Sequence, residues 1–422
     1  MIYLIEEPMF SLEKKDHNFL NSMTFTFKII VITSCMGLIS SCSLFKDGDP
    51  SKDSYQPLWE YNFDIGYFAS IDPIVHKNNV IFSGLDEKKN DFSANSTLEA
   101  FDKDNGQLIW KWDGTIDDSY DQFNYIAQNY VHNNVLYIST GVDYAIDLNE
   151  GTTRSLDDSK IGGQNFHGVD NMILSSFRSQ DDTKEVMKCT SVDSFNWKNL
   201  ITFNNNDSIE FFLEFFISNN QDENIVLIPL TIGRRDFSPG LIKLLKYDLQ
   251  GNIILLEDTL DLDYSRNRFI DFPPEQNEDN VFLSLNGMVA CINKETFEVL
   301  WQKDTNGHSS RSGILYTEDN GLYVNTEFYL YSLNPENGNI NWQTDSRGGS
   351  RLQYHNGVIY YTAGALLRAV DANSGESLMA IEAPSRADDD GAFFQPVMTV
   401  DHENDRIYTA SYTHAYCYPT LR

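Results

Sequence analysis

Basic residues are scarce in this sequence. Its 422 residues include 31 Lys and Arg against 62 Asp and Glu, a formal net charge of −31 at pH 7. Proteins that bind nucleic acids hold the phosphate backbone with clustered Lys and Arg, whereas so acidic a chain repels a polyanion. The composition therefore argues against nucleic-acid binding. With 41% hydrophobic and 13% aromatic residues, the chain is nonetheless globular rather than disordered.

Cysteine and the common catalytic signatures are equally scarce. The chain has five cysteines, no two of them adjacent, and no CxxC or Cys/His pair at metal-ligand spacing. It also lacks a G-x-S-x-G elbow, a phosphate-binding G-x-x-x-x-G-K-[ST] loop and an H-E-x-x-H motif. We therefore predict no disulfide framework, no catalytic residue, no metal site and no cofactor.

Long apolar runs are absent except for one, residues 29–41, which is too short to span a bilayer, since about 20 residues are needed. Its length is that of the hydrophobic region of a secretory signal. The segment Ile39-Ser40-Ser41-Cys42 resembles a bacterial lipobox, in which an aliphatic and two small residues precede a cysteine. That resemblance implies lipidation of Cys42 and a cell-envelope protein anchored in the outer membrane, either periplasmic or exposed at the cell surface.

The segment before Met23 is unusual for a signal peptide, because it contains four acidic residues where positive charge is expected. Met23 is therefore an alternative start, with residues 1–22 not translated. An uncleaved anchor or an ordinary signal peptide is the alternative to lipidation. The predicted organisation is a targeting segment at 1–41, a lipidated linker at 42–56 and one folded domain at 57–422.

From residue 57 onward the sequence repeats one theme. Each copy has an alternating aromatic and aliphatic run, a second apolar run ending in Asp or Asn, a turn with Gly, and a run ending in Trp. Three of the Asp or Asn anchors, Asn293, Asn334 and Asp371, are 41 and 37 residues apart. Self-similarity at about 40–45 residues with β-type alternation is typical of a β-propeller, each copy forming one four-stranded blade. The clearest copies are residues 79–112, 281–302, 322–343 and 358–382.

The turns and tryptophans of the copies fit that architecture. Turns such as residues 104–106 contain the Asn and Gly that positive φ angles favour, and we expect each to join the third and fourth strands of a blade. Trp110, Trp301 and Trp342 close three copies. We expect these rings on outer strands, packed between neighbouring blades, where a large side chain buries the most area.

The two ends of the domain complement each other. The last copy, residues 405–419, stops before its Trp strand, and residues 57–63 read as a Trp strand with no strands before it. Pairing of these segments closes the ring and removes exposed sheet edges. The prediction is an all-β fold, a single propeller of eight four-stranded blades in which the N- and C-terminal strands share one blade. Seven blades are the alternative, because the copies between residues 152 and 215 are degenerate.

Two copies, AFDKDNGQLIW from Ala100 and SLNPENGNINW from Ser332, are good matches to the pattern A-x-D-x-x-T-G-x-x-x-W. The domain thereby resembles the pyrroloquinoline-quinone-like (PQQ-like) propeller repeat family. That resemblance implies the propeller fold and two kinds of function: lipoproteins that act as assembly scaffolds at the outer membrane, and calcium- and quinone-dependent dehydrogenases. The dehydrogenases typically run longer and have a vicinal cysteine pair, and they need a cation site and a tryptophan floor that the sequence does not reveal. The lipoprotein branch is the better match.

Arginine has an uneven distribution in this acidic chain. Six of the 13 arginines fall in four loops that follow outer strands of the late copies. In a propeller such loops lead to the innermost strand of the next blade and converge near the axis, where guanidinium groups bind anions such as carboxylates. Bracing of each loop by a nearby carboxylate, such as Asp345 or Asp388, is the alternative. The candidate ligand- or partner-binding residues are Arg266, Arg268, Arg311, Arg347, Arg351 and Arg386.

The predicted function is that of a non-catalytic cell-envelope lipoprotein whose propeller face binds a protein or an extracellular polymer, as a scaffold or accessory subunit. Two alternatives stay open: a quinone-dependent dehydrogenase, and a propeller that binds or senses a small anionic ligand. The expected partners are an envelope protein or polymer and, through the lipid anchor, a membrane. We expect no nucleic-acid partner and a monomeric protein, since high net charge opposes self-association.

Overall fold

Internal contacts divide the chain into two parts at residues 51 and 52. The computed structural model describes residues of the second part only. Cys42 and the predicted targeting segment therefore lie outside the described residues. The described residues are 55–63, 71–90, 93–112, 130–139, 143–155, 166–169, 171–178, 184–193, 196–204, 209–213, 217–219, 222–234, 241–262, 274–285, 287–306, 313–319, 321–387 and 392–422.

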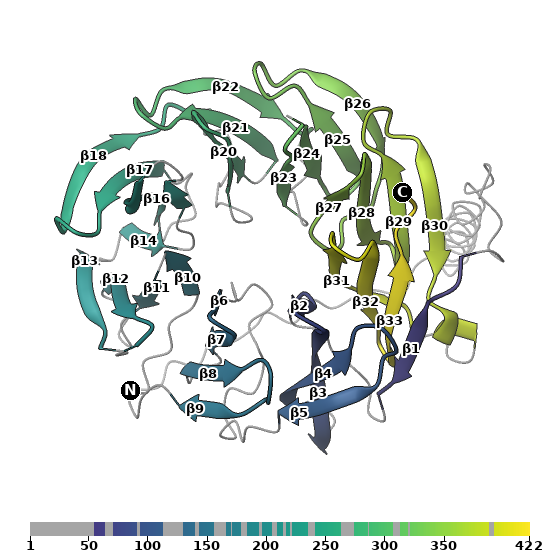
Figure 1. Ribbon diagram of the computed structural model, residues 1–422. Coiled ribbons are helices and arrows are strands. Elements are labelled where there is room, and N and C mark those ends of the chain that lie inside the picture. The colour runs from purple at the N-terminus through teal and green to yellow at the C-terminus, as the bar shows by residue number, and fades with distance from the viewer. Residues whose placement is uncertain are drawn as a thin grey trace, which may run out of the picture. The chain divides into compact units, whose positions relative to one another are not determined.

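Eight antiparallel sheets form a ring in this part of the chain, and each sheet is one blade of a propeller (Figure 1). The strands of a blade follow one another from the centre of the ring outward, and we number the blades in chain order. Blades 1 to 4 are β2 (Ile74–His76), β3 (Asn79–Asn90), β4 (Ser93–Asp102) and β5 (Leu108–Trp112); β6 (Tyr130–His132), β7 (Val135–Ser139), β8 (Asp143–Asp147) and β9 (Thr153–Ser155); β10 (Phe166–Val169), β11 (Met172–Arg178), β12 (Lys184–Ser191) and β13 (Lys198–Asn204); and β14 (Ile209–Leu213), β16 (Asp222–Arg234), β17 (Leu241–Asp248) and β18 (Ile253–Thr259), with β15 (Ile217–Asn219) paired to β16.

The second half of the ring is built in the same way. One turn of 3₁₀ helix, η1 (Pro384–Ala387), follows the last strand of blade 7, β30 (Ser377–Glu382). No helix in the described residues is long and apolar enough to cross a membrane. Blades 5 to 8 are β19 (Glu275–Gln276), β20 (Asn280–Leu285), β21 (Met288–Asn293) and β22 (Val299–Asp304); β23 (Ile314–Tyr316), β24 (Leu322–Asn325), β25 (Tyr329–Leu333) and β26 (Ile340–Asp345); β27 (Gln353–His355), β28 (Val358–Ala363), β29 (Leu366–Asp371) and β30 (Ser377–Glu382); and β31 (Phe394–Asp401), β32 (Arg406–Ser411), β33 (His414–Pro419) and β1 (Trp59–Asn62).

Strand β1 closes the ring. It pairs antiparallel with β33, from Trp59 opposite Cys417 to Asn62 opposite His414. The prediction of eight blades, one of them shared by both termini, is therefore confirmed, and the seven-blade alternative is wrong. The degenerate copies between residues 152 and 215 hid a full blade, because β10–β13 form a regular four-stranded sheet without the Gly–Trp signature of the clear copies.

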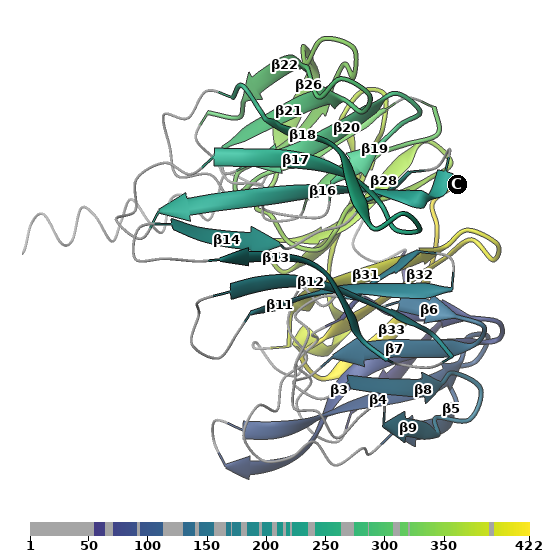
Figure 2. The ribbon, with the colours of Figure 1, turned by 90° about the vertical axis from the view of Figure 1, so that its left-hand side faces the viewer.

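The ring has two faces, and the strands run between them, as Figure 2 shows edge-on. The turns after the first and third strands of a blade lie on one side, which we call the turn face. The backbone N–H of Ala372, in a third turn, donates to the Gly357 carbonyl of a first turn at 2.9 Å. Loops between blades lie on the opposite side, the loop face, where the side-chain stem of Arg347 passes over Gly364 in the turn after a second strand.

Four of the joints between adjacent blades, among the described residues, are built from a tryptophan and a glycine. The tryptophan comes from the outer strand of one blade and covers a glycine in the third turn of the next, where φ lies between +69° and +72°. A Cβ atom added to any of these glycines would lie within 2.7 Å of the indole ring. The expected packing of tryptophans between blades is confirmed. The pairs are Trp59 with Gly106, Trp110 with Gly151, Trp301 with Gly338 and Trp342 with Gly375.

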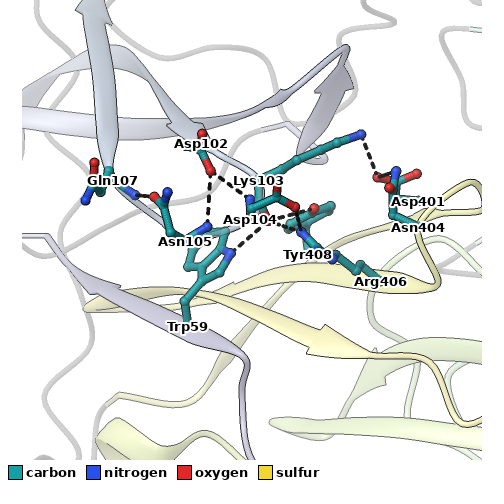
Figure 3. Close-up of polar contacts among 10 residues, drawn as sticks. All are labelled: Trp59, Asp102, Lys103, Asp104, Asn105, Gln107, Asp401, Asn404, Arg406 and Tyr408. Atoms are coloured by element: carbon teal, nitrogen blue, oxygen red, sulfur yellow. Dashed lines mark hydrogen bonds and ion pairs between the residues drawn. The ribbon is translucent and has the colours of Figure 1, made fainter.

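The Asp or Asn anchor of each clear copy organises the turn that receives the tryptophan. The carboxylate of Asp102 accepts the backbone N–H groups of Asp104 and Asn105 at 2.9 and 3.2 Å, which is an Asx turn (Figure 3). The turn exposes the carbonyl of Lys103, which accepts the indole N–H of Trp59 at 3.0 Å. These turns join the third and fourth strands, as predicted. The Asp or Asn, Gly and Trp residues that define the repeat in the sequence are thus the residues that join neighbouring blades.

Candidate functional site

A cavity of about 640 Å³ runs along the innermost strands of the late blades, and we call it the axial cavity. Strands β19, β23 and β27 and the turn after β31 contribute its walls. The cavity extends from Arg351, in the loop before β27, to His355 and His402 at the turn face. Further polar lining residues are Glu275, Thr317, Glu318, Gln353, Tyr354 and Asn356.

Arg351 connects two blades that are not neighbours. Its Nε atom lies 3.8 Å from Oδ2 of Asp72, which precedes the inner strand of blade 1, and the other oxygen of Asp72 accepts the backbone N–H of Met398 at 3.1 Å. Burial raises the pKa of Asp72, and Arg351 and the Met398 N–H oppose that rise by favouring the charged carboxylate. Arg351 also lines the cavity, and 42% of its side chain is exposed.

Glu275 is the second carboxyl group that Arg351 influences. Burial raises the pKa of Glu275 to about 7, although the backbone N–H of Tyr316 and the charge of Arg351 both lower it. Near neutral pH this side chain therefore exchanges between a neutral acid and a carboxylate. The loop-face end of the cavity thus combines a fixed positive charge with a carboxyl group whose charge depends on pH.

The turn-face end of the axial cavity contains a hydrogen-bonded histidine pair. His355 is buried, and its Nδ1 lies 3.0 Å from Nδ1 of His402, so one of these two atoms donates to the other. Nε2 of His355 lies 2.7 Å from a carboxylate oxygen of Asp405. Both ring nitrogens of His355 are therefore used to join blades 7 and 8. Nowhere in the described residues do three or more His, Cys, Asp or Glu form a group able to hold a metal ion.

The structure gives the described candidate arginines different surroundings. Arg386 lies on η1, 3.8 Å from Glu382 of the preceding strand. Arg351 contacts Asp72 rather than a residue of its own loop. Arg347 is exposed on the loop face after β26. Arg266, Arg268 and Arg311 lie outside the described residues.

Sequence reasoning missed the acidic partners of Arg351. Asp72 stands two residues before β2 and Arg351 two residues before β27, so both occupy the same place in the repeat. Glu275 begins β19. Aligning the copies on their inner strands, rather than on the Trp-bearing turns, would have placed these three charges near the axis together.

The residues of the axial cavity do not fit a quinone held over a tryptophan. All six tryptophans lie in the described residues, and none of them lines the cavity. Four cover the turn glycines, Trp112 donates its indole N–H to Thr153 of the next blade, and Trp197 packs against a cluster that includes Tyr137 and Val192. The described cysteines, Cys189, Cys291 and Cys417, lie in blades 3, 5 and 8. No step of a quinone-dependent reaction can therefore be assigned to these side chains.

Eight four-stranded blades define a β-propeller, and its clear copies share the Asx turn and the Gly–Trp joint. Residues 277–415, most of blades 5 to 8, match the family described as "Outer membrane protein assembly factor BamB". This match confirms the resemblance to the PQQ-like propeller family that the repeats predict. The curated proteins include no match to the chain.

Solved structures with the same fold come from proteins of different activities. BamB from Moraxella catarrhalis has a TM-score of 0.58 and 11% identity, over 86% of this chain and 99% of that one. Quinohemoprotein alcohol dehydrogenase ADHIIG from Pseudomonas putida HK5 has a TM-score of 0.59 and 11% identity, over 88% of this chain and 78% of that one. Sqt1 from Chaetomium thermophilum has a TM-score of 0.59 and 11% identity, over 87% of this chain and 100% of that one. At this identity the likeness establishes the fold and leaves the function to the site.

Proposed function

We propose that the protein is a non-catalytic accessory subunit of the bacterial cell envelope, lipidated at Cys42, which binds an envelope protein through its loop face. The observation that carries this proposal is the position of the tryptophan side chains. Every tryptophan packs between blades, so the ring is a rigid support, and no tryptophan lines the axial cavity. The description of the matched family as an outer membrane protein assembly factor supports the same function.

The entry of the chain into the ring favours the loop face as the binding surface. Tyr55 stacks on Tyr418, with ring centres 5.6 Å apart, and donates its hydroxyl to the Pro419 carbonyl. This contact lies at the turn face, because Thr420 bonds to Asp405 in a first turn. A linker that ends at Tyr55 therefore joins the ring on the side away from the loops.

Arg347 is the described candidate that best suits contact with a partner. It is exposed, and its stem lies on the backbone of Gly364, which limits the freedom that binding would have to remove. Arg386, on η1, is less exposed than Arg347. We propose Arg347, with Arg266, Arg268 and Arg311 of the neighbouring loops, as the residues that bind acidic groups of the partner protein.

The test is affinity purification of the native, detergent-extracted lipoprotein from its own envelope, followed by mass spectrometry. We expect stoichiometric recovery of one envelope protein. Replacing Arg311→Gln and Arg347→Gln together is expected to abolish that recovery without lowering the melting temperature. Arg386→Gln is the matched control and is expected to retain the partner. Recovery of the lipoprotein alone, or equal recovery by the double variant, contradicts the proposal.

A small anionic ligand in the axial cavity is the second candidate function. The exposed guanidinium of Arg351 beside Glu275, whose pKa of about 7 leaves it partly neutral, is the observation that favours it. The same purified material distinguishes the two functions. An acidic metabolite that remains bound in the wild type and is lost in Arg351→Gln, with no protein partner recovered, supports ligand binding over scaffolding.

A further inference from the structure

The outer strand of blade 4 has an unusual surface. Three successive apolar residues of β18 are exposed: Ile253 by 52%, Ile254 by 42% and Leu255 by 47%. The first of them stands five residues after the turn anchor Asp248. At that position the clear copies have polar residues, which are Gln107, Glu298, Asn339 and Glu376. Blade 4 therefore has an exposed apolar residue at a position where the clear copies have a polar residue just before the outer strand.

The apolar segment lies on an open sheet edge. Figure 1 shows β18 on the outer rim of the ring, and its pairing in the described residues is with β17 on its inner side. Alternate backbone N–H and C=O groups of an outermost strand point away from the sheet. Edge strands of soluble proteins usually have charges or proline that prevent pairing with a further strand. The first half of β18 has neither.

The second half of β18 and its surroundings are acidic. Glu257 and Asp258 follow the apolar segment, and Asp261 lies two residues beyond β18. Lys243 balances Glu257 by an ion pair, whereas Lys246 pairs with Glu295 of blade 5. The net charge of −31 opposes edge-to-edge pairing of two copies of this chain. An extended segment with basic side chains complements both the edge and its charge.

We propose that the outer edge of β18 is a docking strand, which takes an extended segment of a protein partner with alternating apolar and basic residues as an additional strand of blade 4. Backbone hydrogen bonds supply the register and the three apolar side chains supply the contact area. This inference deepens the proposed function, because it assumes a protein partner, but it assigns binding to the rim of blade 4 rather than to the loop face.

The test uses a defined probe, a fluorescent peptide of alternating Lys and Val, and fluorescence anisotropy with the full-length lipoprotein in detergent. We expect the peptide to bind the wild type. The variant Ile253→Thr/Ile254→Thr/Leu255→Thr keeps strand propensity but removes the apolar surface, and we expect about tenfold weaker binding. The matched control, Leu108→Thr/Ile109→Thr on β5, removes residues of 44% and 47% exposure and is expected to bind as the wild type does.

A second peptide of alternating Lys and Pro has the same charge but cannot donate along the edge, and we expect it not to bind. Equal binding of both peptides, or equal binding by the triple-Thr variant, overturns the proposal, since plain attraction to an acidic protein would explain either result. Absence of binding to the wild type overturns it as well. The Arg311→Gln/Arg347→Gln variant is expected to bind the Lys/Val peptide normally, so failure of the loop-face proposal is recognised separately.

Discussion

The two joints that blade 5 makes with its neighbours differ in which blade supplies the large aromatic ring between them. On the side of blade 6, Trp301 of β22 covers Gly338 in the third turn, and its indole N–H donates to the Pro335 carbonyl at 2.9 Å. On the side of blade 4, Leu256 of β18 stands at the tryptophan position, eight residues after its anchor, and Phe297 stands at the glycine position of the next turn. Phe297 is buried in the same apolar cluster that Leu256 joins.

This difference shows that a joint needs one large ring, and that either blade can supply it. Phe297 has a φ of +59°, a conformation that costs an aromatic residue about 1–2 kcal/mol. Burial of its ring, which is only 3% exposed, offsets that cost by about 2–3 kcal/mol. Where the preceding strand provides tryptophan, glycine is required by space as well as by φ.

Adding a side chain at a Gly–Trp joint should cause the largest loss in the free energy of unfolding. In Gly338→Val the new Cβ would lie 2.6 Å from the Trp301 ring, at a φ of +70°. We expect a loss of about 4 kcal/mol or more in the free energy of unfolding, measured by urea denaturation. Gly357→Ala is the control, because its φ is +77° but the nearest atom is 3.8 Å away. It should lose only about 1 kcal/mol. Similar losses in both variants would show that φ alone, not the indole, requires glycine.

Exchanging the two kinds of joint should have an intermediate effect. Leu256→Trp places a second large ring against Phe297, and Phe297→Gly leaves a cavity, so each single variant is expected to lose about 2–3 kcal/mol. The double variant recreates the arrangement of Trp301 and Gly338. We expect it to regain about 2 kcal/mol relative to the sum of the singles, measured as the coupling energy of a double-mutant cycle. Additive losses would mean that the two positions do not share one space.

The sequence predicted the regular joints and missed the exchanged one, for a physical reason. Repeats are recognised by residue type at fixed spacing, so Trp301, Gly338 and their anchors defined the period and the fold. At Phe297 the joint is still filled by an aromatic ring, but the ring comes from the turn of the next blade instead of the preceding outer strand. The residues of one strand alone do not reveal this exchange. The charges near the axis were missed similarly, because Asp72 and Arg351 meet only when the ring closes and brings blades 1 and 7 within reach.

Two buried titratable groups, one in blade 3 and one in blade 5, respond to pH in opposite directions. Burial lowers the pKa of His167, on β10 in blade 3, to about 4, and burial raises that of Glu275 in blade 5 to about 7. A lowered histidine pKa means that the unfolded chain takes up the proton first, so blade 3 loses stability as pH falls from about 6.5 to 4. A raised carboxyl pKa means that the unfolded chain releases its proton first, so blade 5 loses stability as pH rises from about 4.5 to 7.

Neutral replacements at these two positions should therefore have opposite effects on the pH profile. We expect His167→Gln to reduce the loss of stability between pH 6.5 and 4, and Glu275→Gln to reduce the loss between pH 4.5 and 7, each by about 1–2 kcal/mol once partial exposure is allowed for. Hydrogen exchange of β11–β12 against β20–β21 assigns each effect to its blade, because local opening is measured separately in each sheet. A single profile shared by both sheets in the wild type would mean that the ring unfolds as one unit, and that neither group acts on its own blade alone.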